Sequence, residues 1–241
     1  MKIYDFLENT YKAFLDTLFP LKCCSCGILT NRGEYICNNC RRMLPYIDIE
    51  KRCKFCGKEK EDCDCNSHIR RYNEIVATFK YSDTARNTII RLKHGGRSGY
   101  AAFLAREMAL VINETYRNIK FDYIMYVPTS RTGYRKRGYN QAKLIASKLS
   151  KLFRIPLCHY LKIKENRTPQ HKATNRNERF INSRNKYISK GNLSNKTILL
   201  IDDVSTTGAT LDDATRALLF AGADSVYCAV AAITSQKRKE K

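Results

Sequence analysis

The sequence predicts an α/β protein with a doubly wound, mostly parallel sheet, preceded by a short helix and a cysteine-rich module. Short apolar runs alternate with amphipathic segments between residues 75 and 233, as happens where helices connect parallel strands. Nine of the eleven cysteines lie before residue 66, which sets a small metal-binding region apart from the α/β part. We therefore expect a helix over residues 1–20, a zinc module over 21–68 and the α/β domain over 69–241.

The N-terminal helix is predicted by apolar residues that recur at helical spacing. These residues are Ile3, Leu7, Tyr11, Phe14 and Leu18. Acidic side chains interrupt the segment, so it lacks the continuous apolar stretch of a signal peptide. No run of about 18 apolar residues occurs in the chain, so no transmembrane helix is expected. We expect the helix to pack on its own protein. A membrane-surface position is the less favoured alternative, because the polar face is not rich in Lys or Arg.

The α/β domain is expected to alternate strands with helices. Apolar runs place the strands at residues 75–81, 123–128, 195–202 and 225–233. Amphipathic segments place the helices at residues 84–94, 101–118, 140–153 and 208–223, with a turn over 95–100. The polar and basic segment 163–192 is too long for an ordinary connection, so we expect it to be mobile or functional.

The cysteine module contains four closely spaced pairs. They are Cys23 and Cys26, Cys37 and Cys40, Cys53 and Cys56, and Cys63 and Cys65. Because four thiolates hold a tetrahedral Zn²⁺, we assign one site to the first two pairs and a second site to the last two. Interleaved pairing, and the use of Cys24 in place of Cys23, stay open. All-cysteine sites without an open position are structural, so we expect one or two structural zinc ions.

Positive charge is concentrated after the cysteine module. The formal net charge is +21; residues 1–65 hold 11 basic and 10 acidic side chains, whereas residues 66–241 hold 33 and 13. The densest part is residues 128–190, with 17 Lys and Arg. Such a field favours polyanions, namely pyrophosphate groups, nucleic acid or an anionic membrane face. A basic surface without a specific ligand is the alternative.

Two aspartates, Asp202 and Asp203, end the third apolar strand, and a loop rich in hydroxyl groups leads from them to a helix that starts near Gly208. Ligands of open α/β sheets bind at the carboxyl ends of strands, and the amide groups of a helix N-terminus bind phosphate. Paired carboxylates beside a phosphate would accept hydrogen bonds from the vicinal hydroxyls of a sugar. Helix capping would explain one aspartate but not two.

Residues 198–210, ILLIDDVSTTGAT, resemble the motif with which type I phosphoribosyltransferases bind phosphoribosyl pyrophosphate (PRPP). The resemblance implies the type I phosphoribosyltransferase fold, with Asp202 and Asp203 as catalytic residues that hold the ribose hydroxyls. It implies a 5-phosphate loop made of Ser205, Thr206, Thr207, Gly208, Ala209 and Thr210. Mg²⁺ would arrive with PRPP, because this ion prefers phosphate oxygens and water to an all-protein cage.

The pyrophosphate loop of that family follows an earlier strand, and YVPTSRTGYRKRG holds that place here. The resemblance implies that Pro128, Thr129 and Ser130 form a tight turn and that Arg131 adds a charge. Lys93 could reach the same phosphates; a solvated helix end is the alternative reading. Further contacts to anions or nucleic acid are expected from Arg135, Lys136 and Arg137.

The order of motifs along the whole chain resembles the ComF family of bacterial competence proteins. The motifs are LFPLKCCSCG, CNNC, CKFCG, RLKHGG, VPTSRTGYRKRGYNQA, NRTPQ and the PRPP motif. This resemblance implies a double zinc ribbon ahead of a phosphoribosyltransferase-like domain. It also implies action on incoming single-stranded DNA in the cytoplasm, with proteins of the competence machinery as partners that would bring the chain to the inner face of the membrane.

Three functions follow from these observations. The first is a ComF-type protein that binds PRPP and single-stranded DNA, the DNA following Arg167, Arg176 and Arg179. The second is an active phosphoribosyltransferase with an unidentified small acceptor. The third is a zinc-ribbon adaptor with a vestigial PRPP site. Purine salvage is disfavoured, because Thr206 stands where 6-oxopurine salvage enzymes carry an acid and threonine is no general base at neutral pH.

Overall fold

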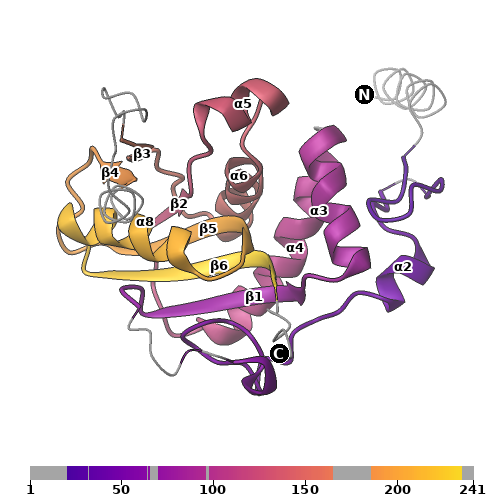
Figure 1. Cartoon of the computed structure of the whole chain (residues 1–241), viewed down its shortest axis with the longest axis horizontal. Helices are drawn as coiled ribbons and strands as arrows, with labels where there is room; N and C mark the ends of the chain where they lie inside the picture. Colours follow the sequence, from indigo (N-terminus) through magenta and orange to yellow (C-terminus); the bar gives the residue numbers. More distant parts are fainter. Residues whose placement is uncertain are drawn as a thin grey trace, which may run out of the picture.

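The computed structural model describes residues 21–31, 33–63, 65, 70–95, 98–164 and 186–234, without the side chains of residues 94, 95 and 98. Its α/β domain is a parallel sheet with helices on both faces (Figure 1). The expected helix over residues 1–20 lies outside the described residues. So do most of the segment 163–192 and, with it, Arg167, Arg176 and Arg179.

Four parallel strands form the sheet in the order β1-β6-β5-β2. They are β1 (Glu74–Lys80), β2 (Tyr123–Tyr126), β5 (Thr197–Ser205) and β6 (Ser225–Ile233). Strand β6 is a nearly continuous apolar run that is mostly buried, and β5 is apolar and fully buried from Ile198 to Ile201. This pattern is expected where helices cover both faces of a parallel sheet, and it confirms the predicted fold class.

Helices cover the two faces unequally. One face packs against α3 (Asp83–Gly95), α4 (Ser98–Thr115) and α6 (Gln141–Phe153), and the other packs against α8 (Ala209–Phe220). The connection that follows β2 therefore runs along one face of the sheet, and the connection that follows β5 runs along the other. Neighbouring strands whose connections diverge in this way leave a crevice at their carboxyl ends, which is where open α/β sheets bind ligands.

Strand β5 is longer than expected. The sequence indicated its end at residue 202, but β5 continues to Ser205, because Val204 and Ser205 still pair with the end of β6. Its other neighbour is short: the last residue of β2 that pairs with β5 is Tyr126, opposite Ile201. The two aspartates therefore lie inside the paired strand, not beyond it, along an edge that β2 leaves open.

Two segments around the crevice were not predicted as regular structure. The short helix α5 (Arg131–Arg137) starts after the turn that follows β2, where we expected a loop. The strands β3 (Leu161–Ile163) and β4 (Tyr187–Ser189) form a separate antiparallel pair. In addition, the expected turn over residues 95–100 is shorter, because α4 starts at Ser98.

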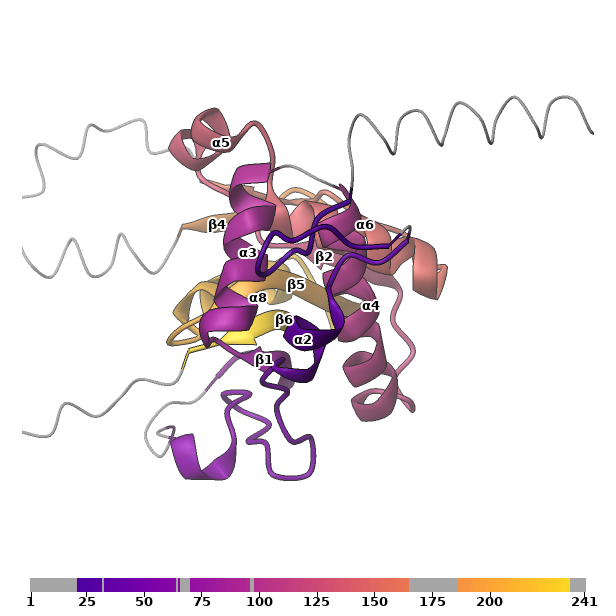
Figure 2. The same ribbon diagram turned by 90° about the vertical axis from the view of Figure 1, so that its right-hand side faces the viewer.

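The cysteine module lies along the free edge of β1. Its middle segment pairs with β1 through hydrogen bonds from Ile47 N to Thr78 O and from Lys80 N to Pro45 O. The first half of the module, with α2 (Asn38–Arg42), packs with the residues of α3 and α4 (Figures 1 and 2). The second half, with the 3₁₀ turn η1 (Lys60–Asp62), lies below β1 in Figure 1. An edge strand that would otherwise present unpaired backbone groups is thus covered.

Glu107 of α4 anchors the first half of the module. This carboxylate is only 7% exposed, and it accepts a hydrogen bond of 2.7 Å from the hydroxyl of Tyr46. Arg41 Nη1 lies 3.3 Å from its other oxygen, Oε1. Burying a carboxylate is costly unless it is paired and hydrogen-bonded, and here both conditions are met.

Candidate functional site

A cavity of about 250 Å³ occupies the crevice between the ends of β2 and β5. Six residues predicted for PRPP binding line it, namely Lys93, Pro128, Thr129, Ser130, Asp202 and Asp203. Arg137, predicted as an anion contact, lines it as well. Asn140 and Gln141, which lie in the motif VPTSRTGYRKRGYNQA, also form part of the wall, as does Lys186. The cavity therefore joins segments that are up to 110 residues apart in sequence, between Lys93 and Asp203.

The two aspartates are held by the backbone that follows them. Asp202 Oδ1 accepts a hydrogen bond of 2.9 Å from Asp203 N, and Asp203 Oδ1 accepts one of 2.9 Å from Val204 N. Lys93 Nζ lies 3.1 Å from Asp203 Oδ2. Burial raises the pKa of Asp202 well above its usual value, and the neighbouring Asp203 carboxylate raises it further, while Lys93 opposes this effect. A bound cation, or hydroxyl groups that donate hydrogen bonds, would therefore stabilise the ionised form of this pair.

Lys93 is held at the cavity from a helix end. It lies in the last turn of α3, and its Nζ group contacts Asp203, so it is not the solvated helix end that the sequence left open. The hydroxyl of Tyr139, just before α6, donates a hydrogen bond to the carbonyl of Leu92. Lys93 is thereby placed to neutralise the carboxylates and to meet an anion in the same cavity.

The turn after β2 is fixed by its own side chains. Ser130 caps α5 by accepting a hydrogen bond of 3.1 Å from Gly133 N. Arg137 Nη2 donates to Thr129 Oγ1 at 2.8 Å, so the last turn of α5 folds back onto the turn that precedes the helix. Arg131 lies at the start of α5 and is exposed.

The residues predicted for the 5-phosphate lie outside the wall of this cavity, at the start of α8. Thr206, Thr207, Ala209 and Thr210 are exposed, whereas Ser205 is buried in the last position of β5. Gly208 has a φ of 75°, a left-handed conformation that glycine adopts without strain. A left-handed residue directly before a helix turns successive amide groups toward one side, which makes a concavity for an anion.

A segment that the sequence did not single out runs beside this loop. Arg70 Nη2 donates a hydrogen bond of 2.6 Å to the carbonyl of Thr207. The hydroxyl of Tyr72 donates one of 2.8 Å to the carbonyl of Phe55, in the second half of the cysteine module. A Cβ atom on Gly208 would lie 3.1 Å from that hydroxyl. Residues 70–72 therefore connect the cysteine module to the loop; no periodicity or motif in the sequence indicates these contacts.

Helix α5 presents a basic surface beside the cavity. Arg135 and Lys136 are exposed in its last turn, where cations also interact favourably with the helix dipole. The ring of Tyr134 is 54% exposed next to them. A cationic surface with an exposed aromatic ring can contact both phosphates and bases of a single strand.

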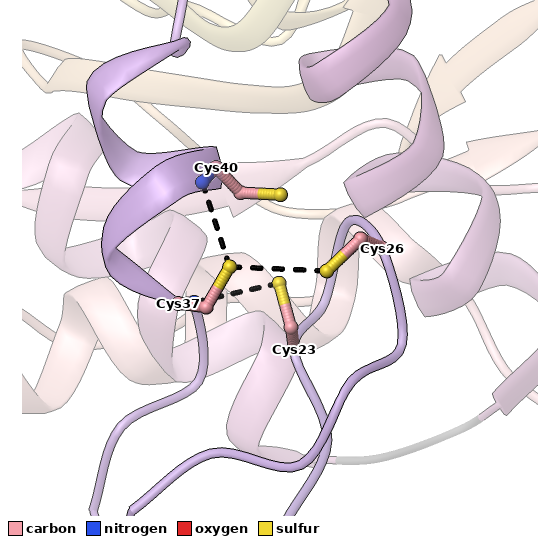
Figure 3. A group of neighbouring side chains, drawn as sticks. All are labelled: Cys23, Cys26, Cys37 and Cys40. Carbon is pink, nitrogen blue, oxygen red and sulfur yellow. Dashed lines mark hydrogen bonds between the residues drawn. The ribbon is translucent and has the colours of Figure 1, made fainter.

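The cysteines form two groups of four, with the members that the spacing indicated. The first contains Cys23, Cys26, Cys37 and Cys40, and the second contains Cys53, Cys56, Cys63 and Cys65. Figure 3 shows the first group, with four sulfur atoms pointing toward one another. Within each group all ligand atoms lie within 4.8 Å of one another. Cys24 is not part of the group: it is buried, with its sulfur 3.6 Å from the hydroxyl of Thr88.

In both groups the sulfur atoms lie close enough together to share one zinc ion, although Cys63 Sγ and Cys65 Sγ, 3.1 Å apart, are closer than a tetrahedral site requires. A tetrahedral ion with Zn–S bonds of about 2.3 Å places sulfur atoms about 3.8 Å apart, and Cys26 Sγ lies 3.8 Å from Cys37 Sγ. In the second group Cys56 Sγ lies 3.7 Å from Cys63 Sγ. Burial acts to raise the pKa of Cys23, but backbone N–H groups, including that of Cys37, lower it to about 6, which favours the thiolate that binds metal. All four positions are filled by protein ligands, so such an ion would be structural.

No helix in the described part of the chain is long and apolar enough to cross a membrane.

Known proteins resemble this chain over most of its length. Residues 102–241 match the phosphoribosyl transferase domain family, and residues 14–70 match the double zinc ribbon domain. Competence protein F of Haemophilus influenzae is 25% identical over 86% of this chain and 95% of its own length. Competence protein ComFC of Bacillus subtilis is 28% identical over 80% of this chain and 82% of its own length. Competence protein ComFC of Streptococcus pneumoniae is 28% identical over 86% of this chain and 97% of its own length.

Proposed function

Because the chain belongs to the phosphoribosyl transferase domain family and carries a double zinc ribbon, as its resemblance to ComF competence proteins led us to expect, we propose that it binds PRPP and single-stranded DNA during DNA uptake. The observation that carries the proposal is the cavity between β2 and β5, which gathers the aspartate pair, the turn after β2, Lys93 and Arg137. These are groups suited to a sugar, a pyrophosphate and a cation.

Each part of PRPP has a proposed place. The carboxylates of Asp202 and Asp203 accept hydrogen bonds from the ribose hydroxyls. The turn over residues 128–131, Lys93 and Arg137 hold the pyrophosphate, whose charge needs stabilisation whether it stays bound or leaves. The loop over residues 205–210 holds the 5-phosphate with backbone amides and threonine hydroxyls. Mg²⁺, when bound with PRPP, would neutralise part of the pyrophosphate charge and lie near the aspartates.

Binding of single-stranded DNA is supported by charge and by the surface of α5. Residues 66–241 hold 33 basic side chains against 13 acidic ones. Arg135, Lys136 and Tyr134 offer phosphate contacts and a stacking surface at the rim of the PRPP cavity. The relatives named competence proteins support a role in DNA uptake, with competence-machinery proteins as partners in the cytoplasm or at the inner face of the membrane.

We propose that the zinc ions act only by stabilising the fold. Each four-cysteine group would close one half of the module, and small modules of this kind depend on the metal for folding. The first half covers α3 and α4, and the second reaches the segment that contacts the 5-phosphate loop. Zinc would therefore maintain the surroundings of the cavity without entering the reaction.

The test is a calorimetric titration of PRPP with Mg²⁺, in the absence and presence of a single-stranded oligonucleotide. We expect both ligands to bind, DNA affinity to fall steeply with salt, and each ligand to change the affinity for the other by the same factor. DNA binding that is absent or insensitive to salt would refute the DNA part. Acceptor-dependent release of pyrophosphate would make the chain an active transferase. Failure of millimolar PRPP to raise the melting temperature would favour the adaptor function.

A further inference from the structure

Gln141 is a buried residue in the wall of the cavity whose amide nitrogen has no partner. The residue is only 3% exposed, and it is the first residue of α6. Among the residues that the structure describes, none accepts a hydrogen bond from its Nε2 atom. A buried donor without an acceptor loses its hydrogen bonds to water and gains nothing in return, which destabilises the fold. Such a group needs an explanation, and a ligand in the cavity supplies one.

The backbone around Gln141 is held by the preceding residue, which places the start of α6 beside the cavity. The preceding Asn140 caps α6: its Oδ1 accepts a hydrogen bond of 3.1 Å from Lys143 N. Its Nδ2 donates one of 2.9 Å to the carbonyl of Val127, directly after β2. Gln141 is therefore tied to the β2 side of the cavity, next to the turn over residues 128–130, and the aspartates come from β5 on the other side.

A second donor on the same side is also unsatisfied. Arg137 Nε is buried and has no partner among the described residues, although Nη2 of the same guanidinium donates to Thr129. The start of α6 adds a partial positive charge, because α6 is 13 residues long and its first amides lie at this end. Lys93 lines the same cavity. The β2 side thus offers donors and positive charge, which suit an anion with several oxygen atoms.

We propose that Gln141 and Arg137 complete the pyrophosphate subsite, with Gln141 Nε2 and Arg137 Nε donating hydrogen bonds to pyrophosphate oxygens of PRPP. This inference rests on the proposed function, because it assumes that PRPP occupies the cavity. It assigns a binding role to Gln141, and it specifies Nε as the atom through which Arg137, already placed at the pyrophosphate, donates. It also accounts for a donor that is costly to bury in the ligand-free protein.

The test compares Gln141→Leu with wild type and with a control, Thr115→Val. Leucine keeps much of the volume of Gln141 but removes the donor. Thr115, at the end of α4, also has a buried hydroxyl without a partner among the described residues, but it lies outside the cavity. Calorimetry would measure the affinities for Mg²⁺–PRPP, for Mg²⁺–pyrophosphate and for ribose 5-phosphate, and a thermal melt would report the stability without ligand.

We expect Gln141→Leu to weaken PRPP and pyrophosphate binding about tenfold, the effect of one lost hydrogen bond to a charged acceptor. Its affinity for ribose 5-phosphate should be unchanged, and its melting temperature without ligand unchanged or higher. Gln141→Glu should weaken PRPP binding further, because a carboxylate repels pyrophosphate. Thr115→Val should change no affinity.

Two results would overturn the inference. One is wild-type affinity for PRPP in Gln141→Leu; the other is a large fall in its melting temperature without ligand, which would mean that the amide is bonded within the protein. If wild type itself binds no PRPP, the proposed function fails first, and the two failures are thus distinguishable.

Discussion

Arg70 Nη2 donates a hydrogen bond of 2.6 Å to the carbonyl of Thr207, across 137 residues of sequence. Because a trans peptide is planar, fixing the Thr207 carbonyl also fixes the Gly208 N–H, which points the opposite way. That amide is one of the donors at the start of α8. Arg70 therefore orients the 5-phosphate loop from outside it, and its charge lies close to the phosphate that the loop is proposed to bind.

Arg70→Gln is expected to weaken the binding of ribose 5-phosphate and of PRPP about tenfold, because both the hydrogen bond to Thr207 and the nearby charge are lost. Calorimetry with pyrophosphate alone should show no change. Arg71→Gln is the matched control, because Arg71 pairs with Asp212 and, within the part of the chain that the structure describes, forms no hydrogen bond with the loop. Equal losses in the two variants would contradict a specific role for Arg70.

Loss of the second zinc site is expected to weaken phosphate binding by the loop over residues 205–210. Tyr72 connects Phe55, which lies between Cys53 and Cys56 in the second half of the cysteine module, to the segment that carries Arg70. Cys53→Ser with Cys56→Ser should remove one zinc, measured by elemental analysis, and should weaken ribose 5-phosphate binding several-fold. Cys23→Ser with Cys26→Ser should remove one zinc and leave that affinity unchanged, because the first group contacts α3 through Arg91 Nε and Ser25 O.

Tyr72→Phe tests the same connection without touching a metal ligand. It removes only the hydroxyl that bonds Phe55 O, so zinc content should stay at the wild-type value while affinity for ribose 5-phosphate falls. Unchanged affinity in this variant and in the Cys53/Cys56 variant would show that the loop does not depend on the second ribbon.

Asp202→Asn is expected to stabilise the ligand-free protein at neutral pH and to remove PRPP binding. Burial and the charge of Asp203 raise the pKa of Asp202 in the folded protein. Ionised Asp202 therefore lowers the stability of the folded protein at neutral pH. This loss of stability disappears as the pH falls below about 4, the pKa of an aspartate in the unfolded chain. Melting curves should show a higher melting temperature for the variant at pH 8, by about 2 °C or more, and a vanishing difference near pH 4. A lower melting temperature at pH 8 would contradict the assigned cause.

Arg135→Gln with Lys136→Gln is expected to weaken single-stranded DNA binding without changing PRPP affinity. Each lost phosphate contact should reduce the slope of log K against log salt by about 0.7, giving about 1.4 for both. Fluorescence anisotropy at several salt concentrations measures the slope. Lys148→Gln with Lys151→Gln removes the same charge near the other end of α6. An equal effect there would mean that net charge, and not α5, determines binding.

The helices, the strands and the two cysteine groups were largely predictable from the sequence, because they depend on residue patterns within short segments. The last strand matches the predicted residues 225–233, because its apolar run is buried along most of its length and Gly222 marks the preceding turn. The cysteine spacing also indicated the membership of both groups. The end of strand β5 was predicted too early, because Val204 and Ser205 are held by pairing with β6, which local sequence does not reveal.

The candidate site was only partly predictable. Asp202 and Asp203 stand out because two acids follow an apolar run, but the contact of Asp203 with Lys93 depends on how α3 is placed. Arg70 could not be found, because its partner is distant in sequence. Gln141 lies in the quoted motif GYNQA, yet its significance comes from burial without a partner, a property of the folded chain alone.

The most direct test of the account is a calorimetric titration of Mg²⁺–PRPP into the wild-type chain and into Asp202→Asn with Asp203→Asn, with the melting temperature of each variant confirming that it is folded. We predict saturable binding with a stoichiometry of about one per chain in the wild type, and no measurable binding in the folded double variant. Absence of binding to the wild type, or equal binding to both proteins, would contradict it.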